Sequence, residues 1–398
     1  MSLAIAIFFF FALAVALAVL PFVPAILEWR RKLDAEPLTV AYASSVDVRH
    51  FANSFREFVE LRLRGTVDQC RETGRAERGT LDDGTRYAAF GEGDAPLFTA
   101  EELENRASHH LIAVGGNIDL PAETMFLPEI YADGSVRGGE GNIYRAILAG
   151  EAIILGRESM SLRWLHATRA IVAQAGTILF GRASADEFIR LERGCRFERL
   201  NAPRVEFCYQ AEAGEFAGGM TYRESAVLKS RDLPNHIEVK AGRWLVSGNL
   251  ELPPGRILKA NVVVTGSMRI RTGTHVVGSI KSHKDMVLEK GVEVDGSVLS
   301  ERDITFEKGC RIYGPVMAER DISVGEGVVF GTATRPTTVV AERIFVEPGA
   351  VAHGTVWAHT DGRVVLSSSS GWKKDRTENE APADPAQPVQ PTGEGDRA

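Results

Sequence analysis

Glycines with a fixed spacing constrain the fold of this chain more than any other feature. Between residues 273 and 330 a glycine recurs every eighteen residues, at Gly273, Gly291, Gly309 and Gly327. Two further series keep the same step, namely Gly278, Gly296 and Gly314, and Asp285, Asp303 and Asp321. Self-similarity at a fixed period indicates a repeat architecture, in which each repeat stacks on its neighbours.

A finer step of six residues lies inside each eighteen. Apolar or small residues recur in pairs at positions i and i+2, and mostly charged residues or glycines separate the pairs. Two residues that are two apart share one face of a strand, and glycine supplies the turn after it. Three such sides make one coil of a triangular β-helix, so we predict a mainly β fold. The predicted inward residues are Met286, Leu288, Val292, Val294, Val298, Ile304, Phe306, Ile312, Val316, Ile322, Val324, Val328 and Phe330, with turns at the seven glycines named above.

The same register extends to both sides of this stretch. Upstream it reaches Trp244, and downstream it breaks around Pro336 and resumes with the pair Thr338/Val340. We therefore predict a regular β-helix over residues 241–366. Residues 111–240 show the pattern more loosely and are predicted to form a degenerate solenoid section, with inward pairs at Ile118/Leu120, Thr124/Phe126, Ile130/Ala132, Ala146/Leu148, Ala152/Ile154 and Ala170/Val172.

An uncharged apolar segment, Leu3 to Leu27, begins the chain. A run of about 20 apolar residues spans a bilayer as a helix. A cleaved signal peptide would have a basic start and a shorter apolar core. The basic residues Arg30, Arg31 and Lys32 come after the segment, and such residues stay cytoplasmic. We predict a transmembrane anchor over residues 1–32, with the body of the protein in the cytoplasm.

Residues 33–110 are expected to form a juxtamembrane helical and linker region. Apolar residues from Val48 to Leu63 fall at helical spacing, and the stripe they form packs either on this chain or on a bilayer or partner helix. Residues 65–100 fit a flexible linker or a small irregular module, and Glu101 to His110 a short helix. Residues 367–398 are rich in Pro, Ser and charge and are predicted to be a disordered tail.

Composition and motifs argue against several classes of function. The net charge of −7 and the lack of a basic run argue against a nucleic-acid partner. The four cysteines have no metal-binding spacing and are expected to be reduced, and the repeated aspartates are expected to cap turns rather than hold Ca²⁺. We predict no catalytic, cofactor-binding or metal-binding residue, and no cofactor.

One enzymatic alternative is a hexapeptide-repeat acyltransferase, which uses this periodicity and a histidine as general base. In the predicted register the candidate histidines all fall between inward positions, and no carboxylate is seen to orient them as a base requires; they are His275, His283, His353 and His359. A second alternative is a membrane adaptor whose solenoid face binds one partner without polymerising.

Residues 242–365 resemble the bactofilins, which are polymer-forming cytoskeletal proteins of bacteria. The resemblance rests on "VVVTGSMRI", "VDGSVLSERDITFEKGCRIYGPVMAERDISV" and "IFVEPGAVAHGTVWA". It implies a right-handed β-helix that assembles without nucleotide near the membrane, with a scaffold role in cell shape or envelope synthesis. Together with the anchor, it implies a single-pass protein of the bacterial inner membrane, with envelope-synthesis proteins as further partners. This chain departs from the family pattern because an anchor and a second section precede the regular solenoid.

The predicted mode of assembly is self-association through the end of the β-helix. The last coil is expected to present unpaired backbone N–H and C=O groups, which form a template for another strand. We therefore expect two copies to dock end to end through their C-terminal coils. If residues 111–240 instead covered the N-terminal end of the regular solenoid, one polymerising face would be lost.

Overall fold

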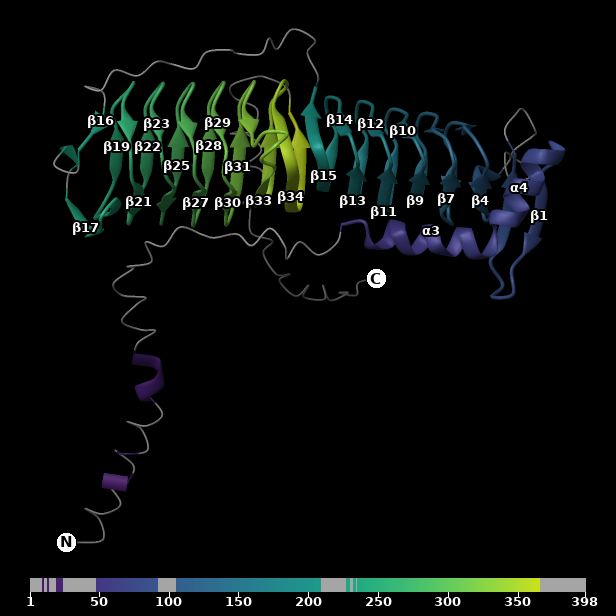
Figure 1. The fold of residues 1–398 in the computed structure, drawn as a ribbon, viewed down its shortest axis with the longest axis horizontal. Helices are drawn as coiled ribbons and strands as arrows, with labels where there is room; N and C mark the ends of the chain where they lie inside the picture. The colour runs from purple at the N-terminus through teal and green to yellow at the C-terminus, as the bar shows by residue number, and fades with distance from the viewer. Residues whose placement is uncertain are drawn as a thin grey trace, which may run out of the picture.

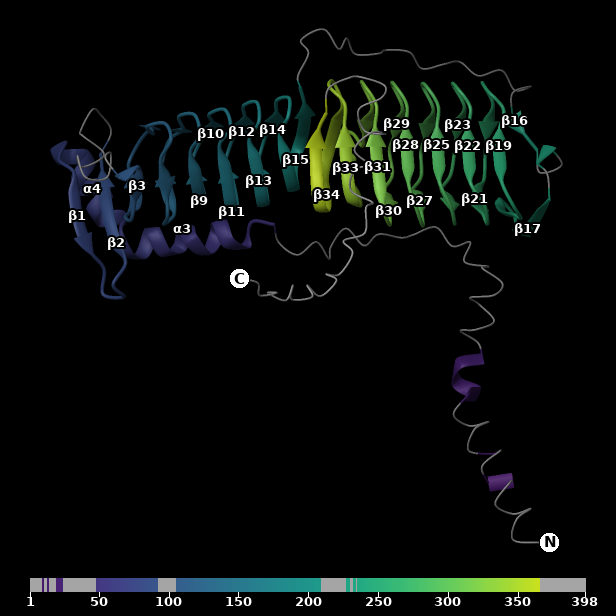
Figure 2. The ribbon, with the colours of Figure 1, turned by 180° about the vertical axis from the view of Figure 1, so that it is seen from behind.

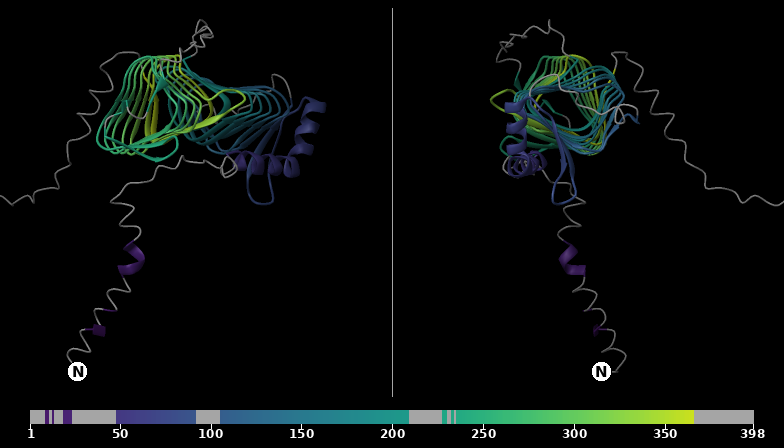
Figure 3. Two further views of the ribbon diagram at one scale, coloured as in Figure 1. Left: turned by 60° about the vertical axis from the view of Figure 1, so that its left-hand side comes forward. Right: turned by 90° about the vertical axis from the view of Figure 1, so that its right-hand side faces the viewer.

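The protein is a long β-solenoid of about 13 turns with two helices packed along one part of it (Figure 1). This computed structural model describes residues 48–91, 105–208, 227–229, 232–233 and 235–365, with short pieces at 9–10, 13 and 19–23. The prediction of a mainly β solenoid is confirmed. Figure 2 shows the same rod from behind, and Figure 3 shows its coils stacked along a common axis.

Most of the predicted anchor and the whole predicted tail at 367–398 lie outside the described residues. Within the anchor, the structure describes a 3-10 turn, η1 (Leu20–Phe22). Among the helices that the structure describes, none is both long and apolar enough to span a bilayer.

The N-terminal section is a stack of short, mostly parallel strands. Each strand pairs with one that lies a coil further along, as when Ile112 pairs with Ile130. The strands are β3 (Ala107–Ser108), β4 (Leu111–Val114), β5 (Ile118–Asp119), β6 (Met125–Phe126), β7 (Ile130–Ala132), β8 (Val136–Arg137), β9 (Ile143–Ala149), β10 (Ala152–Leu155), β11 (Met160–Ala167), β12 (Ala170–Ala173), β13 (Ile178–Ala185), β14 (Phe188–Leu191) and β15 (Arg196–Phe207).

The C-terminal section keeps the predicted eighteen-residue step through most of its length. Met286 pairs with Ile304, and Ile304 pairs with Ile322. Its strands are β16 (Val227–Leu228), β17 (His236–Lys240), β18 (Arg243–Val246), β19 (Leu250–Leu252), β20 (Ile257–Leu258), β21 (Asn261–Val264), β22 (Met268–Ile270), β23 (His275–Val276), β24 (Ile280–Ser282), β25 (Met286–Leu288), β26 (Glu293–Val294), β27 (Val298–Ser300), β28 (Ile304–Phe306), β29 (Arg311–Ile312), β30 (Val316–Ala318), β31 (Asp321–Val324), β32 (Val329–Phe330), β33 (Thr337–Val346) and β34 (Val351–Val364).

The two glycine series of the C-terminal section have different physical causes. Gly273, Gly291 and Gly309 have φ of +66°, +66° and +73°, a left-handed conformation that side chains disfavour. Gly296 does not have a left-handed φ, but a Cβ at this position would overlap the backbone of Gly278 in the preceding coil. One series therefore turns the chain, and the other lets successive coils approach closely.

The two sections meet at their C-terminal coils, at a junction between β15 and β34 (Figure 1). These strands pair antiparallel around the coil, and Leu200 of β15 lies opposite Val356 of β34. A single hydrophobic core continues through both sections. The expectation that the last coil exposes unpaired backbone groups is therefore wrong, and the N-terminal section covers the C-terminal end of the regular solenoid rather than its N-terminal end.

Helices α3 (His50–Arg62) and α4 (Arg64–Thr73) cover one outer face of the N-terminal section. Val59 and Leu63 are buried in a second apolar cluster, which includes Ala146 and Leu148 of β9. The stripe of the amphipathic helix thus packs against its own chain. This packing also explains why the predicted inward pair Ala146/Leu148 is wrong by one residue. These two side chains face the helices, and Ile147 and Ala149 face the solenoid core. The predicted pairs Ala152/Ile154 and Ala170/Val172 are also wrong by one residue. The residues that face the core there are Ile153/Leu155 and Ile171/Ala173.

The expectation of a linker or irregular module after the helices is wrong for residues 77–90. They form a hairpin of β1 (Glu77–Thr80) and β2 (Arg86–Phe90), and β2 pairs with β4 at the end of the N-terminal section. Of the predicted helix at Glu101–His110, the structure describes residues 105–110, in which Asn105 is helical and strand β3 follows at Ala107–Ser108. The hairpin therefore ends the rod on this side, and its outer strand β1 pairs only with β2 among the described strands.

Two buried thiols predict how stability depends on pH. Burial raises the pKa of both Cys195 and Cys310 to about 12, from an ordinary value of 9.0. Between pH 9 and 12 the unfolded chain loses these protons while the folded chain keeps them, so the free energy of unfolding falls as pH rises. We expect Cys310→Ala to make this decline shallower by about 1.4 kcal/mol per pH unit. Urea unfolding of the unmodified protein and of the Cys310→Ala variant at pH 9, 10 and 11 measures the difference. If the free energy of unfolding fell equally steeply with pH in the two proteins, the burial of this thiol would be contradicted.

Candidate interaction site

The predicted inward residues lie in the interior of the C-terminal section. All thirteen side chains are at most 3% exposed. Large apolar side chains meet there, as when the ring of Phe306 packs edge-on against that of Phe330 at 5.2 Å. Since packed side chains fill the interior, a binding site has to lie on the outer surface or at an end of the rod.

The repeated aspartates stabilise neighbouring coils. Asp321 forms two hydrogen bonds of 2.8 Å with the guanidinium group of Arg343. Asp303 accepts a hydrogen bond of 3.3 Å from the backbone N–H of Asp321. In the described ranges, no group of three or more potential ligands is placed to hold a metal ion.

Two of the four candidate histidines contact a carboxylate of the next coil, which was not expected from the sequence. His275 Nε2 lies 3.0 Å from Asp295 Oδ1, and His283 Nδ1 contacts Glu301 Oε1. The sequence signal for such pairs is a separation of eighteen or twenty residues, one coil apart. His283 Nε2 is buried without a hydrogen-bond partner, so it does not reach a substrate in this structure. This arrangement does not favour a role for His283 as a general base.

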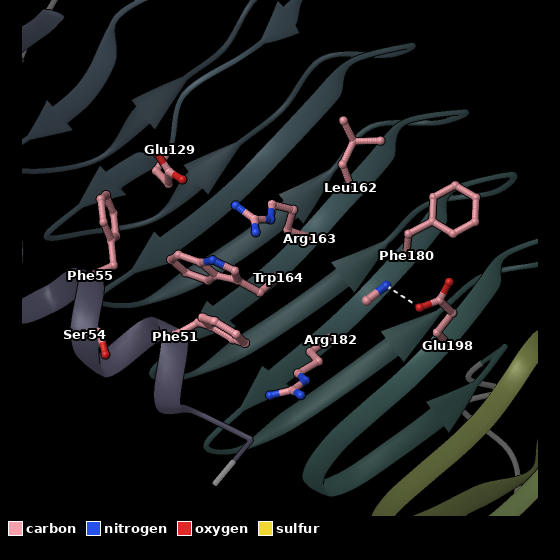
Figure 4. Close-up of a pocket in the computed structure, with 11 residues that line it drawn as sticks. Phe51, Ser54, Phe55, Glu129, Leu162, Arg163, Trp164, Phe180, Arg182 and Glu198 are labelled. Carbon is pink, nitrogen blue, oxygen red and sulfur yellow. Dashed lines mark hydrogen bonds between the residues drawn. The ribbon is translucent and has the colours of Figure 1, made fainter. Parts of the chain in front are cut away.

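A groove of ≈ 520 Å³ runs beside α3 on the outer face of the N-terminal section (Figure 4). The first turns of α3 form one wall, and the outer residues of β11, β13 and β15 form the other. The lining residues are Phe51, Ser54, Phe55, Glu129, Leu162, Arg163, Trp164, Phe180, Gly181, Arg182 and Glu198.

Irregular pairing of β11 and β13 shapes the floor of the groove. The register shifts between Ser161 and Trp164 in β11, and between Leu179 and Arg182 in β13. An extra residue in a strand bends it and redirects side chains, and such bulges often lie beside functional sites. In β13 the irregularity needs glycine, because Gly181 has a φ of +73° and a Cβ there would overlap the carbonyl oxygen of Arg163.

Ion pairs at both ends of the helical region hold the groove open. Arg49, just before α3, forms an ion pair of 2.9 Å with Asp186. Arg64 and Arg71 of α4 both pair with Asp133, with Arg64 at 3.0 Å. Between these anchors, the ring of Phe55 packs edge-on against Trp164 at 5.6 Å. The wall that α3 forms is therefore preorganised.

Positive charge in the groove is only partly balanced. Glu198 accepts a hydrogen bond of 2.8 Å from the backbone N–H of Gly181, and Glu129 accepts one of 2.9 Å from Arg145. Both carboxylates thus have donors already. Across the part of the chain that the structure describes, neither Arg163 nor Arg182 pairs with a carboxylate, although the guanidinium of Arg182 lies 5.2 Å from the ring centre of Phe51.

A third arginine continues this positive charge toward the junction. Arg199 of β15 lies opposite Arg182 of β13, and its guanidinium lies 4.7 Å from the ring centre of Trp357 in β34. Burial, and then the charge of Arg182, lower the pKa of Arg199. Its Nε is buried without a hydrogen-bond partner. Sequence reasoning missed this site, and the one available signal was the spacing of Trp164, Arg182 and Arg199 by eighteen and seventeen residues.

Comparison with known proteins leaves the chain unassigned. No family model matches it, and neither a curated protein nor a solved structure matches it. The resemblance to the bactofilins therefore remains a hypothesis that rests on the sequence motifs.

Proposed function

We propose that this chain is a non-enzymatic, bactofilin-like scaffold that self-associates and organises envelope or cell-shape machinery. The junction between β15 and β34 is the observation that carries the proposal. It joins two solenoids of opposite direction into one rod with a continuous core, which suits a spacer or a building block better than a catalyst. The predicted apolar segment Leu3–Leu27 would hold this rod at the bacterial inner membrane, with its body in the cytoplasm.

Self-association would use the end of the rod that carries β17. Strand β17 pairs antiparallel with β18, and no described strand pairs with its other edge. Its apolar residues Ile237 and Val239 are exposed, Ile237 at 61%. An exposed edge strand is a template for pairing with another chain. If two copies paired antiparallel about Val239, Glu238 of each copy would face Lys240 of the other, which is a favourable cross-strand pair.

This interface predicts limited assembly. At the opposite end the outer strand β1 also pairs with only one described strand, β2, but it is a short polar strand, Glu-Arg-Gly-Thr. A short, charged edge strand opposes strand addition. Joining two β17 ends would therefore give a rod of two copies instead of an open filament. Electron microscopy and light scattering of the full-length chain, and of a chain lacking residues 1–32, test the proposal. Monomers throughout the accessible concentration range would contradict it, and long filaments would contradict assembly through the β17 end alone.

A variant at the edge strand tests the interface itself. We expect Ile237→Lys to shift the chain to the monomer, because lysine on an edge strand opposes strand addition. Met317→Lys is the matched control, since Met317 is also exposed but lies on β30 in the middle of the rod. Light scattering at equal concentration should show monomers for Ile237→Lys and unchanged assembly for Met317→Lys. Equal assembly in both variants would exclude the β17 interface.

A further inference from the structure

We propose that the groove beside α3 binds a short acidic peptide segment of a partner protein. An apolar side chain of the peptide would lie between α3 and the strands, and its carboxylates would pair with Arg163 and Arg182. This inference goes beyond the scaffold role and does not depend on self-association.

The arginines supply the first argument, through charge complementarity. The two carboxylates that line the groove already accept hydrogen bonds, whereas Arg163 and Arg182 have no described carboxylate partner. Like charges on opposite residues of neighbouring strands are destabilising, and Arg182 and Arg199 form such a pair. A bound carboxylate would relieve this repulsion, and the planar guanidinium can bind both of its oxygens.

The apolar lining supplies the second argument. Phe51 is 46% exposed and Leu162 is 45% exposed, and they lie on opposite walls of the groove (Figure 4). Exposed apolar residues that gather with charged ones mark interaction sites. The volume of ≈ 520 Å³ falls in the range of ligand sites, and the half-exposed walls suit side chains that enter from a peptide.

A lipid surface fits the same groove less well. The groove is concave and its floor lies between α3 and the strands, whereas a bilayer presents a flat surface. Two carboxylates, Glu129 and Glu198, line the groove beside the arginines, and Asp186 pairs with Arg49 just before α3. A flat anionic surface would lie close to these carboxylates as well as to the arginines, whereas a short acidic segment would contact the arginines only.

A peptide array on the full-length protein tests the proposal. The probes are fluorescein-labelled peptides of about 12 residues in which Asp or Glu flanks Phe or Leu, each matched by a version with Asn or Gln. We expect acidic peptides to bind about tenfold more tightly than their amide versions. Arg182→Gln should remove this difference, and Phe51→Ala should weaken both versions. Arg137→Gln is the control, because Arg137 is an exposed arginine of the same section that lies outside the groove.

Each other outcome would overturn the proposal. If acidic and amide peptides bind alike, or if Arg182→Gln and Arg137→Gln bind alike, the groove does not select carboxylates. If phosphatidylglycerol vesicles bind, and Arg182→Gln but not Arg137→Gln abolishes that binding, the ligand is a lipid headgroup. If removal of residues 366–398 strengthens peptide binding at least about tenfold, the occupant is this chain's own C-terminal segment. The dimer test at β17 is independent of all these results.

Discussion

Replacing Val292 with aspartate is expected to lower the free energy of unfolding by at least about 3 kcal/mol. Val292 is 0% exposed and lies in the core of the C-terminal section, next to Gly291 at a turn. A carboxylate there would have to lose its hydration without a partner, or take up a proton and remain an unpaired polar group. Urea denaturation monitored by circular dichroism measures the loss.

The matched control is Val277→Asp, which makes the same chemical change on the surface. Val277 is 39% exposed and comes directly after β23 in the same section. We expect this variant to stay within about 0.5 kcal/mol of the unmodified chain. If both variants lost the same free energy, the inward register of the regular solenoid would be incorrect. A loss at Val292 with intact assembly would argue that the rod tolerates local opening of one coil.

The regular register could be predicted from the sequence because one face of each strand is buried and the other is solvated. In strands such as β28, Ile304 and Phe306 face the core while Thr305 lies between them on the outer side. The pattern then has a period of two, and only one register buries the apolar residues. The insertion near Pro336 removed this constraint, so the predicted pair Thr338/Val340 is wrong by one residue and Val339 and Ala341 face the core.

In the N-terminal section, apolar and polar residues alternate less clearly along the strands, so the register was harder to predict. Residues 146–149 of β9 are all buried, because the inner pair faces the solenoid core and the outer pair lies in the cluster with α3. A strand that is buried on both faces has a continuous apolar run, and its register cannot be chosen from periodicity. Knowing where an amphipathic helix docks would have decided it, but docking is a tertiary contact.

The groove could not be predicted because its parts are far apart in sequence. Phe51 belongs to a helix before the solenoid, and Arg163 and Arg182 belong to successive coils with irregular pairing. The aromatic residues of α3 were recognised as an apolar stripe, and their packing on the chain explains only part of them, since Phe51 stays half exposed. The charge balance of the site depends on which carboxylates already have donors, which sequence spacing does not show.

The junction is the feature that most changes the predicted assembly. The repeat pattern shows that the solenoid has a last coil, but it does not show which segment of the chain covers that coil. Here the covering strand, β15, lies about 150 residues earlier in the chain, and Asn201 donates a hydrogen bond of 2.8 Å to Thr355 Oγ1 across the junction. The close approach also explains Gly362, where a Cβ would overlap the ring of Phe197. A contact between two C-terminal coils, which was expected between two molecules, thus forms within one.

A disulfide between positions 201 and 355 is expected to form within one chain. Opposite residues of antiparallel strands have Cα atoms about 4.5–5.5 Å apart, which is within the range that a disulfide spans. In the chain-entropy account, the Asn201→Cys/Thr355→Cys bridge would stabilise the fold by roughly 5 kcal/mol. Non-reducing electrophoresis and urea unfolding measure both effects. In the control, Asn201→Cys/Thr338→Cys, no bridge should form, because Thr338 lies one strand further away, paired with Thr355. Disulfide-linked dimers from the 201/355 pair would show instead that the two sections exchange between copies.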